Sequence, residues 1–520
     1  MHENRETSET PAVKPGSKSA GEGLGRTARM YVPEESHDGI VPMNHSNKDK
    51  RPLAESEEGR PSIKENACQP HTYPTQSGKG VSQGLAGVRK AARENKEMKF
   101  TALLHHLTVD LLRESFYSLK RKAAPGVDGV TWQEYETGLE DRLTDLHGRV
   151  HRGAYRALPS RRVYIQKGEG RQRPLGVAAL EDKIVQQAVV TILNQIYEED
   201  FLGFSYGFRP GRSQHDALDA LSYALLKKKV NYILDADIRG FFDNLDKRWL
   251  VKFVEHRVAD PRILRLIQKW LKAGVMEEGK WSEPKTGSPQ GSVISPLLAN
   301  IYLHYCFDLW VNVWRKKWAQ GEVVVIRYAD DTIAGFQYQR DADRFLENLR
   351  ERLAKFGLEL HPDKTRRIEF GRFAEENRKR RGEGKPETFD FLGFKHISGK
   401  NSLGRFTVRR TTIRKRMRSK LRELKQELHR RMHDPVPQTG GWLKSVVQGY
   451  FNYYAVPGNL ESLAVFRERL LGLWWRTLRR RSQQHRLPWT RMLTLGRRWL
   501  PQPHVLHPYP AVRFAATHLR

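Results

Sequence analysis

The chain has 520 residues, and its 91 Lys and Arg against 60 Asp and Glu give a net charge of +31. This length allows about two to four domains, and so basic a balance indicates a polyanionic partner, usually nucleic acid. The only two cysteines, Cys68 and Cys306, exclude a disulfide framework and a cysteine-based zinc site. Since no apolar run reaches about 18 residues and no targeting signal is present, we expect no membrane partner and a cytoplasmic, nucleic-acid-associated protein.

The first 95 residues differ in composition from the rest of the chain. They are rich in Glu, Ser, Gly, Pro, Asn and Lys, and their positive and negative charges nearly cancel. Such a segment buries too little apolar surface to offset its ordering entropy. We therefore expect residues 1–95 to be a disordered leader, with order beginning near Phe100.

From about residue 160 to residue 395, amphipathic helices alternate with short β-rich runs, which predicts an α+β fold. Helical spacing of apolar residues indicates helices near 103–116 and 181–199. Between them, 161–177 has the pattern of a basic β-hairpin that turns at 168–170. Its Lys167 and Arg173 are suited to clamp a triphosphate, although a solvated basic hairpin would look the same.

Two further strands, 230–238 and 322–336, carry carboxylates. In the second, Asp330 and Asp331 lie between two apolar runs, so a short hairpin would place both at its tip. Adjacent carboxylates repel each other, and a bound divalent cation removes this repulsion. An ordinary Asp-rich turn is the alternative.

The strand 230–238 supplies Asp237, and two-metal phosphoryl transfer needs carboxylates from separate strands to converge on one point. Asp235 and Asp243 are also candidates. Asp243 could instead cap the following helix, and Asp235 could be solvated, or buried and paired. A Gly/Ser/Pro/Gln loop then enters an apolar helix at 286–303, and its backbone amides suit phosphate or sugar contact.

After about residue 400 the composition becomes strongly basic, with 25 Lys and Arg against 5 Asp and Glu in 401–520. Helices are predicted at 411–432, 442–455 and 461–481, and the first has its apolar residues on one face. Basic side chains off this stripe, and a run at the end of the third helix, are predicted to bind nucleic acid: Arg414, Lys415, Arg418, Arg422, Lys425, Arg479, Arg480 and Arg481.

The order of these motifs resembles reverse transcriptases. The basic hairpin is followed by DADIRGFF, GSPQGS, YADD, GLELHPDKT and FDFLGF, and supporting stretches lie at 123–136, 173–188 and 204–218. More narrowly, the chain resembles a group II intron-encoded reverse transcriptase/maturase that lacks the endonuclease domain. The resemblance implies a right-hand polymerase, with fingers and palm over 96–395, a helical thumb or maturase X domain over 396–490 and a C-terminal tail over 491–520.

The resemblance also implies roles for individual residues. Asp237, Asp330 and Asp331, with the backbone of Ile238, would bind two Mg²⁺ ions, and Lys364 would help to protonate the leaving pyrophosphate. Phe242 would crowd the sugar 2′ position and so exclude ribonucleotides. The other nucleotide-binding residues would be Lys167, Arg173 and Gln290, and the primer grip would comprise Phe391, Leu392 and Gly393.

The implied function is RNA-directed DNA synthesis on an RNA template from a DNA primer and dNTPs, with binding of intron RNA to assist splicing and retrohoming. Two alternatives stay open. One is an RNA-binding splicing maturase without polymerase activity, against which the three intact aspartates argue. The other is a domesticated or defence-related reverse transcriptase, whose catalytic core would look the same.

Overall fold

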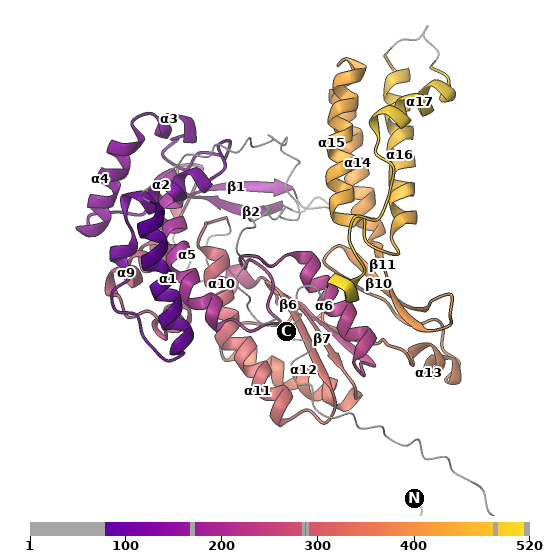
Figure 1. Ribbon diagram of the computed structural model, residues 1–520, viewed down its shortest axis with the longest axis horizontal. Helices are drawn as coiled ribbons and strands as arrows, with labels where there is room; N and C mark the ends of the chain where they lie inside the picture. The colour runs from indigo at the N-terminus through magenta and orange to yellow at the C-terminus, as the bar shows by residue number, and fades with distance from the viewer. Residues whose placement is uncertain (1–77, 167–171, 283–286, 288–290, 482–486, 514–520) are drawn as a thin grey trace, which may run out of the picture. The chain divides into compact units, whose positions relative to one another are not determined.

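The computed structural model describes residues 78–166, 172–282, 287, 291–481 and 487–513. Most of the predicted leader, Lys167, the hairpin turn at 168–170 and Gln290 lie outside these residues. The described chain is mainly helical and contains three small sheets (Figure 1). None of its described helices has the length and apolarity needed to cross a bilayer.

The region that the resemblance assigns to the fingers begins earlier in the chain than the composition predicts. Helix α1 spans Gly78–Glu94 and packs against α5, Leu180–Asp200. Its Leu85, Val88 and Ala92 are buried in the main core. The prediction of disorder up to residue 95 is therefore wrong for 78–94. These three side chains lie on one narrow face of the helix. The average composition of a polar segment does not reveal so few apolar positions.

The predicted helix at 103–116 is divided into a 3₁₀ turn, Leu104–His106, and helix α2, Val109–Ser118. The hydroxyl of Thr108 accepts a hydrogen bond from the amide of Leu111 and so caps α2. The remaining fingers helices are α3, Trp132–Glu136, and α4, Leu139–His151.

The basic hairpin is confirmed. Strands β1, Ser160–Gln166, and β2, Gln172–Val177, pair antiparallel. Strand β4, Val275–Glu277, pairs parallel with β1, and β5, Lys280–Ser282, completes the sheet order β2-β1-β4-β5.

The palm sheet has the order β6-β7-β3-β8. Its strands are β6, Val323–Tyr328; β7, Asp331–Phe336; β3, Tyr232–Ala236; and β8, Arg366–Glu369. Helix α6, Gln214–Lys227, contacts β6, and α12, Gln339–Ala354, contacts β3 and β7. Strand β3 therefore lies between two partners, carries Asp235 and leads directly into Asp237.

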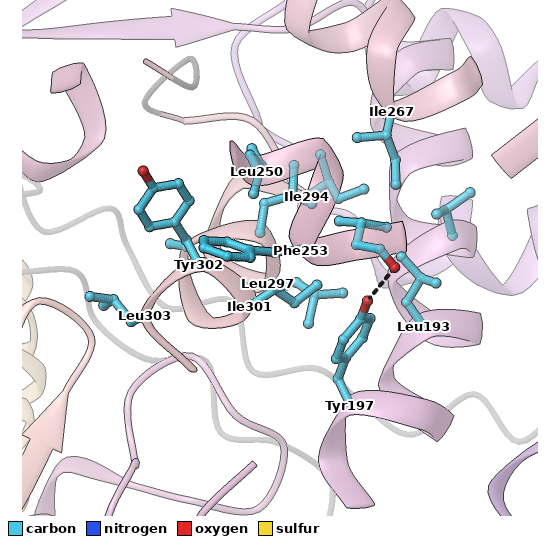
Figure 2. Close-up of a cluster of buried hydrophobic side chains, with 14 of the residues drawn as sticks. Leu193, Tyr197, Leu250, Phe253, Ile267, Ile294, Leu297, Ile301, Tyr302 and Leu303 are labelled. Carbon is cyan, nitrogen blue, oxygen red and sulfur yellow. Dashed lines mark hydrogen bonds between the residues drawn. The ribbon is translucent and has the colours of Figure 1, made fainter. Parts of the chain in front are cut away.

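The main core joins α5 to the helices that lie between Asp237 and β6 in the chain (Figure 2). These helices are α7, Phe241–Asn244; α8, Lys247–Glu255; α9, Pro261–Lys272; and α10, Ser295–Leu303. The hydroxyl of Tyr197 donates to the carbonyl of Val254 within this cluster. After α10 the chain continues through a π-helix, His304–Asp308, into α11, Leu309–Lys317.

Beyond β8 lie α13, Ala374–Arg380, and a sheet of order β11-β10-β9. Its strands are β9, Phe389–Phe391; β10, Phe394–Lys400; and β11, Phe406–Thr412. The helical region comprises α14, Arg414–Arg430; α15, Val436–Tyr454; α16, Leu460–Arg479; and α17, Trp489–Trp499 (Figure 1). The predicted apolar stripe of α14 is confirmed: Met417, Leu421, Leu424 and Leu428 are buried.

Candidate active site

The hairpin between β6 and β7 carries the predicted aspartate pair. Tyr328 pairs with Asp331, and Ala329 and Asp330 form the turn. Ala329 has a φ of 54°, in the left-handed region that a residue with a Cβ seldom adopts. Asp331 is exposed, whereas Asp330 is half-buried. The sequence prediction of two aspartates at a hairpin tip is confirmed.

The sheet order brings the third aspartate to this tip. Asp237 directly follows β3, whose Ala236 pairs with Thr332 of β7. The pKa of Asp330 is raised, first by burial and then by the nearby Asp237 carboxylate. The carboxylate that directly follows β3 therefore lies close enough to the β6–β7 turn to affect Asp330, as a shared cation site requires.

Lys364 reaches the same point from the segment after α12. Its Nζ lies 2.8 Å from Oδ2 of Asp237, and both side chains are partly exposed. The amide of His361 donates to the carbonyl of Asp237, and the amide of Arg239 donates to that of Glu359. This short ladder does not use the carbonyl of Ile238, the backbone group that the resemblance assigns to a metal.

The two other carboxylate candidates have different environments. Asp235 lies 3.9 Å from Arg366, and burial raises its pKa to about 6. Of the alternatives for this residue, pairing matches the structure. Asp243 does not cap the following long helix; Asp246 does, accepting from the amides of Arg248 and Trp249. The capping prediction fails because the short helix α7 intervenes before α8 begins.

The fingers contribute positive charge to the site. Arg173 is exposed on β2, and its charge lowers the pKa of Asp330, against the larger effect of burial. The positive charge of Arg173 therefore acts on Asp330 from a second sheet.

Of the predicted phosphate-contacting loop, the structure describes Gly287 and the residues from Gly291 onward. A Cβ on Gly291 would lie 2.8 Å from the carbonyl oxygen of Gly176, and one on Gly287 would lie 2.9 Å from that of Phe242. Oε1 of Gln186 accepts from the hydroxyl of Ser292 and the amide of Val293, which anchors the loop to α5.

The two phenylalanines of α7 have different environments. Phe241 is 2 % exposed and belongs to the main core, whereas Phe242 is half-buried and packs edge to face against it. A purely structural role therefore describes Phe241 better than Phe242.

The sequence did not predict the residues that contact the aspartate hairpin from its buried side. A Cβ on Gly207 would lie 2.3 Å from the backbone nitrogen of Ala329, so this position has no room for a side chain. Arg327 of β6 is completely buried. An arginine inside the otherwise apolar run 323–328 was the available signal for it.

The predicted basic surface of α14 is exposed at all five positions: Arg414, Lys415, Arg418, Arg422 and Lys425. Arg479 and Arg480 of the second cluster are also exposed, and Arg479 stacks on the ring of Trp475 at 4.8 Å. Arg481 differs, because it is half-buried and donates to the carbonyl of Asp434.

The predicted primer grip forms the turn between β9 and β10. Leu392 and Gly393 have φ values of 44° and 82°. The hydroxyl of Tyr453, on α15, donates to the carbonyl of Leu392. This bond ties the turn to the helical region.

Among the described residues, no cluster of three or more His, Cys, Asp or Glu side chains could hold a metal unaided. Mg²⁺ commonly takes one or two protein carboxylates and completes its shell with water and substrate phosphates. The coupled Asp237 and Asp330 fit that donor set. Strand-borne carboxylates, a lysine beside them and an arginine from a second sheet define the class as a polymerase-type nucleotidyltransferase.

Comparison with known proteins agrees with this class. Residues 165–396 match the family described as "Reverse transcriptase (RNA-dependent DNA polymerase)". Protein YkfC of Escherichia coli (strain K12) is 36% identical over 281 residues, which cover 48% of this chain and 73% of that protein. The group II intron-encoded protein LtrA of Lactococcus lactis subsp. cremoris is 34% identical over 222 residues, covering 42% of this chain and 37% of LtrA.

The chain belongs to the reverse transcriptase family. Members of this family act on nucleic acid and nucleotides and generally use divalent metal ions. The match spans little more than a third of LtrA.

Proposed function

We propose that this chain copies an RNA template into DNA from a DNA primer, using two Mg²⁺ ions held by Asp237, Asp330 and Asp331. The pairing of β3 with β7, which brings Asp237 beside the hairpin that carries Asp330 and Asp331, is the observation that supports this assignment most directly. Lys364 lies 2.8 Å from Asp237 at the same point. The carbonyl of Ile238, which the ladder with Glu359 and His361 leaves out, completes the proposed ligands.

When bound, the two ions would activate the primer 3′-hydroxyl and neutralise the charge that develops on the triphosphate. The chain's own residues orient the reactants. Arg173, whose charge acts on Asp330, would hold the triphosphate through charge-assisted hydrogen bonds, together with Lys167 and Gln290. Lys364, 2.8 Å from Asp237, would deliver a proton to the leaving pyrophosphate. The partly exposed ring of Phe242 would lie under the sugar and select against a 2′-hydroxyl.

We further propose that the RNA partner is a group II intron, whose splicing and retrohoming the protein assists. The name of LtrA states that it is encoded by such an intron. Residues 401–520 contain 25 basic and 5 acidic residues, and the predicted basic side chains of α14 are exposed. These side chains would supply a surface for a large structured RNA.

Primer extension with an RNA template, a DNA primer and dNTPs tests the proposed polymerase. The wild type should extend the primer only with a divalent cation, and the Asp330→Ala/Asp331→Ala variant should lose extension while it still binds RNA. Extension by that variant would refute the site. A wild type that binds and splices intron RNA but never extends a primer would instead establish a maturase without polymerase activity.

A second assay tests whether the protein assists the splicing of an intron or is a domesticated reverse transcriptase. The protein is added to a transcript that carries its flanking non-coding sequence, and release of ligated exons is followed. Faster splicing than with protein-free transcript supports the intron partner. Wild-type polymerase activity without any effect on splicing would refute that part of the proposal.

A further inference from the structure

A buried ion pair lies directly behind the proposed catalytic hairpin. The side chains of Arg327, on β6, and Asp308, in the π-helix, are 1% and 0% exposed. Nε of Arg327 donates to Oδ1 of Asp308 at 2.7 Å, and Nη2 donates to Oδ2. This two-point contact fixes the plane of the guanidinium as well as its position.

The remaining donors of Arg327 reach three other segments. Nη1 donates to the backbone carbonyl of Ala329 at 2.9 Å and to Oδ1 of Asn300 at 3.1 Å. Nη2 donates to the hydroxyl of Ser205 at 2.7 Å. Asn300 in turn donates to the carbonyl of Gly207, the residue whose Cα packs against the hairpin turn. One arginine thus links the hairpin to α10, to the π-helix and to the loop at 205–207.

The contact with Ala329 matters because of the peptide group to which it belongs. The carbonyl of Ala329 and the amide of Asp330 form one planar unit, so holding the oxygen fixes the orientation of the Asp330 backbone. Ala329 also has a φ of 54°, and a residue with a Cβ keeps such a conformation only where its surroundings enforce it. Arg327 supplies that restraint from the buried side of the turn.

We propose that Arg327 is a positioning residue, which Asp308 orients and which sets the direction of the Asp330 carboxylate through the Ala329–Asp330 peptide. This inference rests on the proposed function, since it gives Asp330 a reason to be held. Lysine cannot replace Arg327, because a single ammonium cannot grip a carboxylate at two points and also reach the other three acceptors.

The competing explanation is that the pair merely stabilises the fold. Arg257 provides the matched control, since its side chain is 3% exposed, pairs with Asp200 at 2.9 Å and donates to the carbonyls of Ala92, Asn95 and Met98. Arg257, which follows α8, contacts α1 and the residues just after it, and does not contact the catalytic hairpin. Arg257→Lys therefore reports the cost of weakening a buried arginine pair elsewhere in the chain.

The experiment compares Arg327→Lys with Arg257→Lys in the full chain. The melting temperature, the single-turnover rate of primer extension and the Mg²⁺ concentration at half-maximal rate are measured. Hydrogen exchange of the amides in 328–332 is followed separately, without nucleic acid. Arg327→Lys should lower the rate by about 10²-fold, raise the Mg²⁺ requirement and speed exchange at Asp330. Arg257→Lys should lower the melting temperature comparably but leave the rate within about twofold and the exchange unchanged.

A folded Arg327→Lys protein with wild-type rate, Mg²⁺ dependence and exchange would overturn the proposal. If that variant does not fold, Ser205→Ala removes one acceptor of Arg327 and leaves the ion pair intact. It should then show the same changes at smaller size, and wild-type behaviour would overturn the proposal equally. Because the exchange measurement needs no catalysis, it tests the restraint even if the wild type proves inactive as a polymerase.

Discussion

Gly207→Ala tests how closely the catalytic hairpin must be placed. The added Cβ would lie 2.3 Å from the nitrogen of Ala329 and 2.9 Å from the carbonyl carbon of Tyr328. Real Cβ contacts stay at 3.0 Å or more, so the two backbones must separate by about 0.7 Å. Both of these atoms belong to the backbone and cannot rotate away.

A displacement of this size should harm catalysis more than folding. Overpacking costs about 1–3 kcal/mol of stability, whereas a misplacement of about 1 Å at a reacting group can cost about 10²-fold in rate. We expect Gly207→Ala to fold and to extend a primer about 10²-fold more slowly at saturating nucleotide.

The assay is single-turnover primer extension, paired with thermal unfolding. Gly472→Ala is the control: it lies in α16, nothing would meet its Cβ within 4 Å, and the change should stabilise that helix by about 0.5–1 kcal/mol without altering the rate. A folded Gly207→Ala protein within twofold of the wild-type rate would refute the view that the loop at 205–207 sets the hairpin.

Three further predictions concern other parts of the chain. A protein that begins at Gly78 should fold and extend primers, whereas one that begins at Lys96 should lose about 3–6 kcal/mol in chemical denaturation, because the buried Leu and Val of α1 are gone. Phe242→Ala should raise ribonucleotide incorporation in a competition assay; a folded variant with unchanged sugar selection would exclude the gate. Arg418→Ala with Arg422→Ala should reduce the log–log salt slope of RNA binding by about 1.4–1.8, and an unchanged slope would show that this face of α14 does not meet phosphates.

Local signals predicted much of the fold and the core of the site. The run 322–336 has apolar residues on both sides of two aspartates, and such a pattern specifies a hairpin tip without long-range information. The stripe along α14 predicted its buried face for the same reason. Both patterns depend only on neighbours close in sequence.

Features that depend on tertiary contacts were not predictable from pattern. Helix α1 is stabilised by packing against α5, and the average composition of its polar segment carries no information about that contact. The pairing of Arg327 with Asp308, and the close approach of Gly207 to Ala329, join segments far apart in the chain. Asp246 rather than Asp243 caps α8, because Asp243 lies within the short helix α7, which precedes α8 in the chain.

The central claim is that Asp237, directly after β3 of the palm sheet, carries the catalytic metal ions with the hairpin aspartates. Asp235 is its natural control, since it lies two residues earlier, within β3, and pairs with Arg366. Both are changed to Asn, and Mg²⁺-dependent DNA synthesis is measured under single-turnover conditions on an RNA template. Asp237→Asn should abolish synthesis while RNA binding and melting temperature persist, and Asp235→Asn should keep most of the rate. Synthesis that survives in Asp237→Asn, or that is lost equally in both variants, would contradict the account.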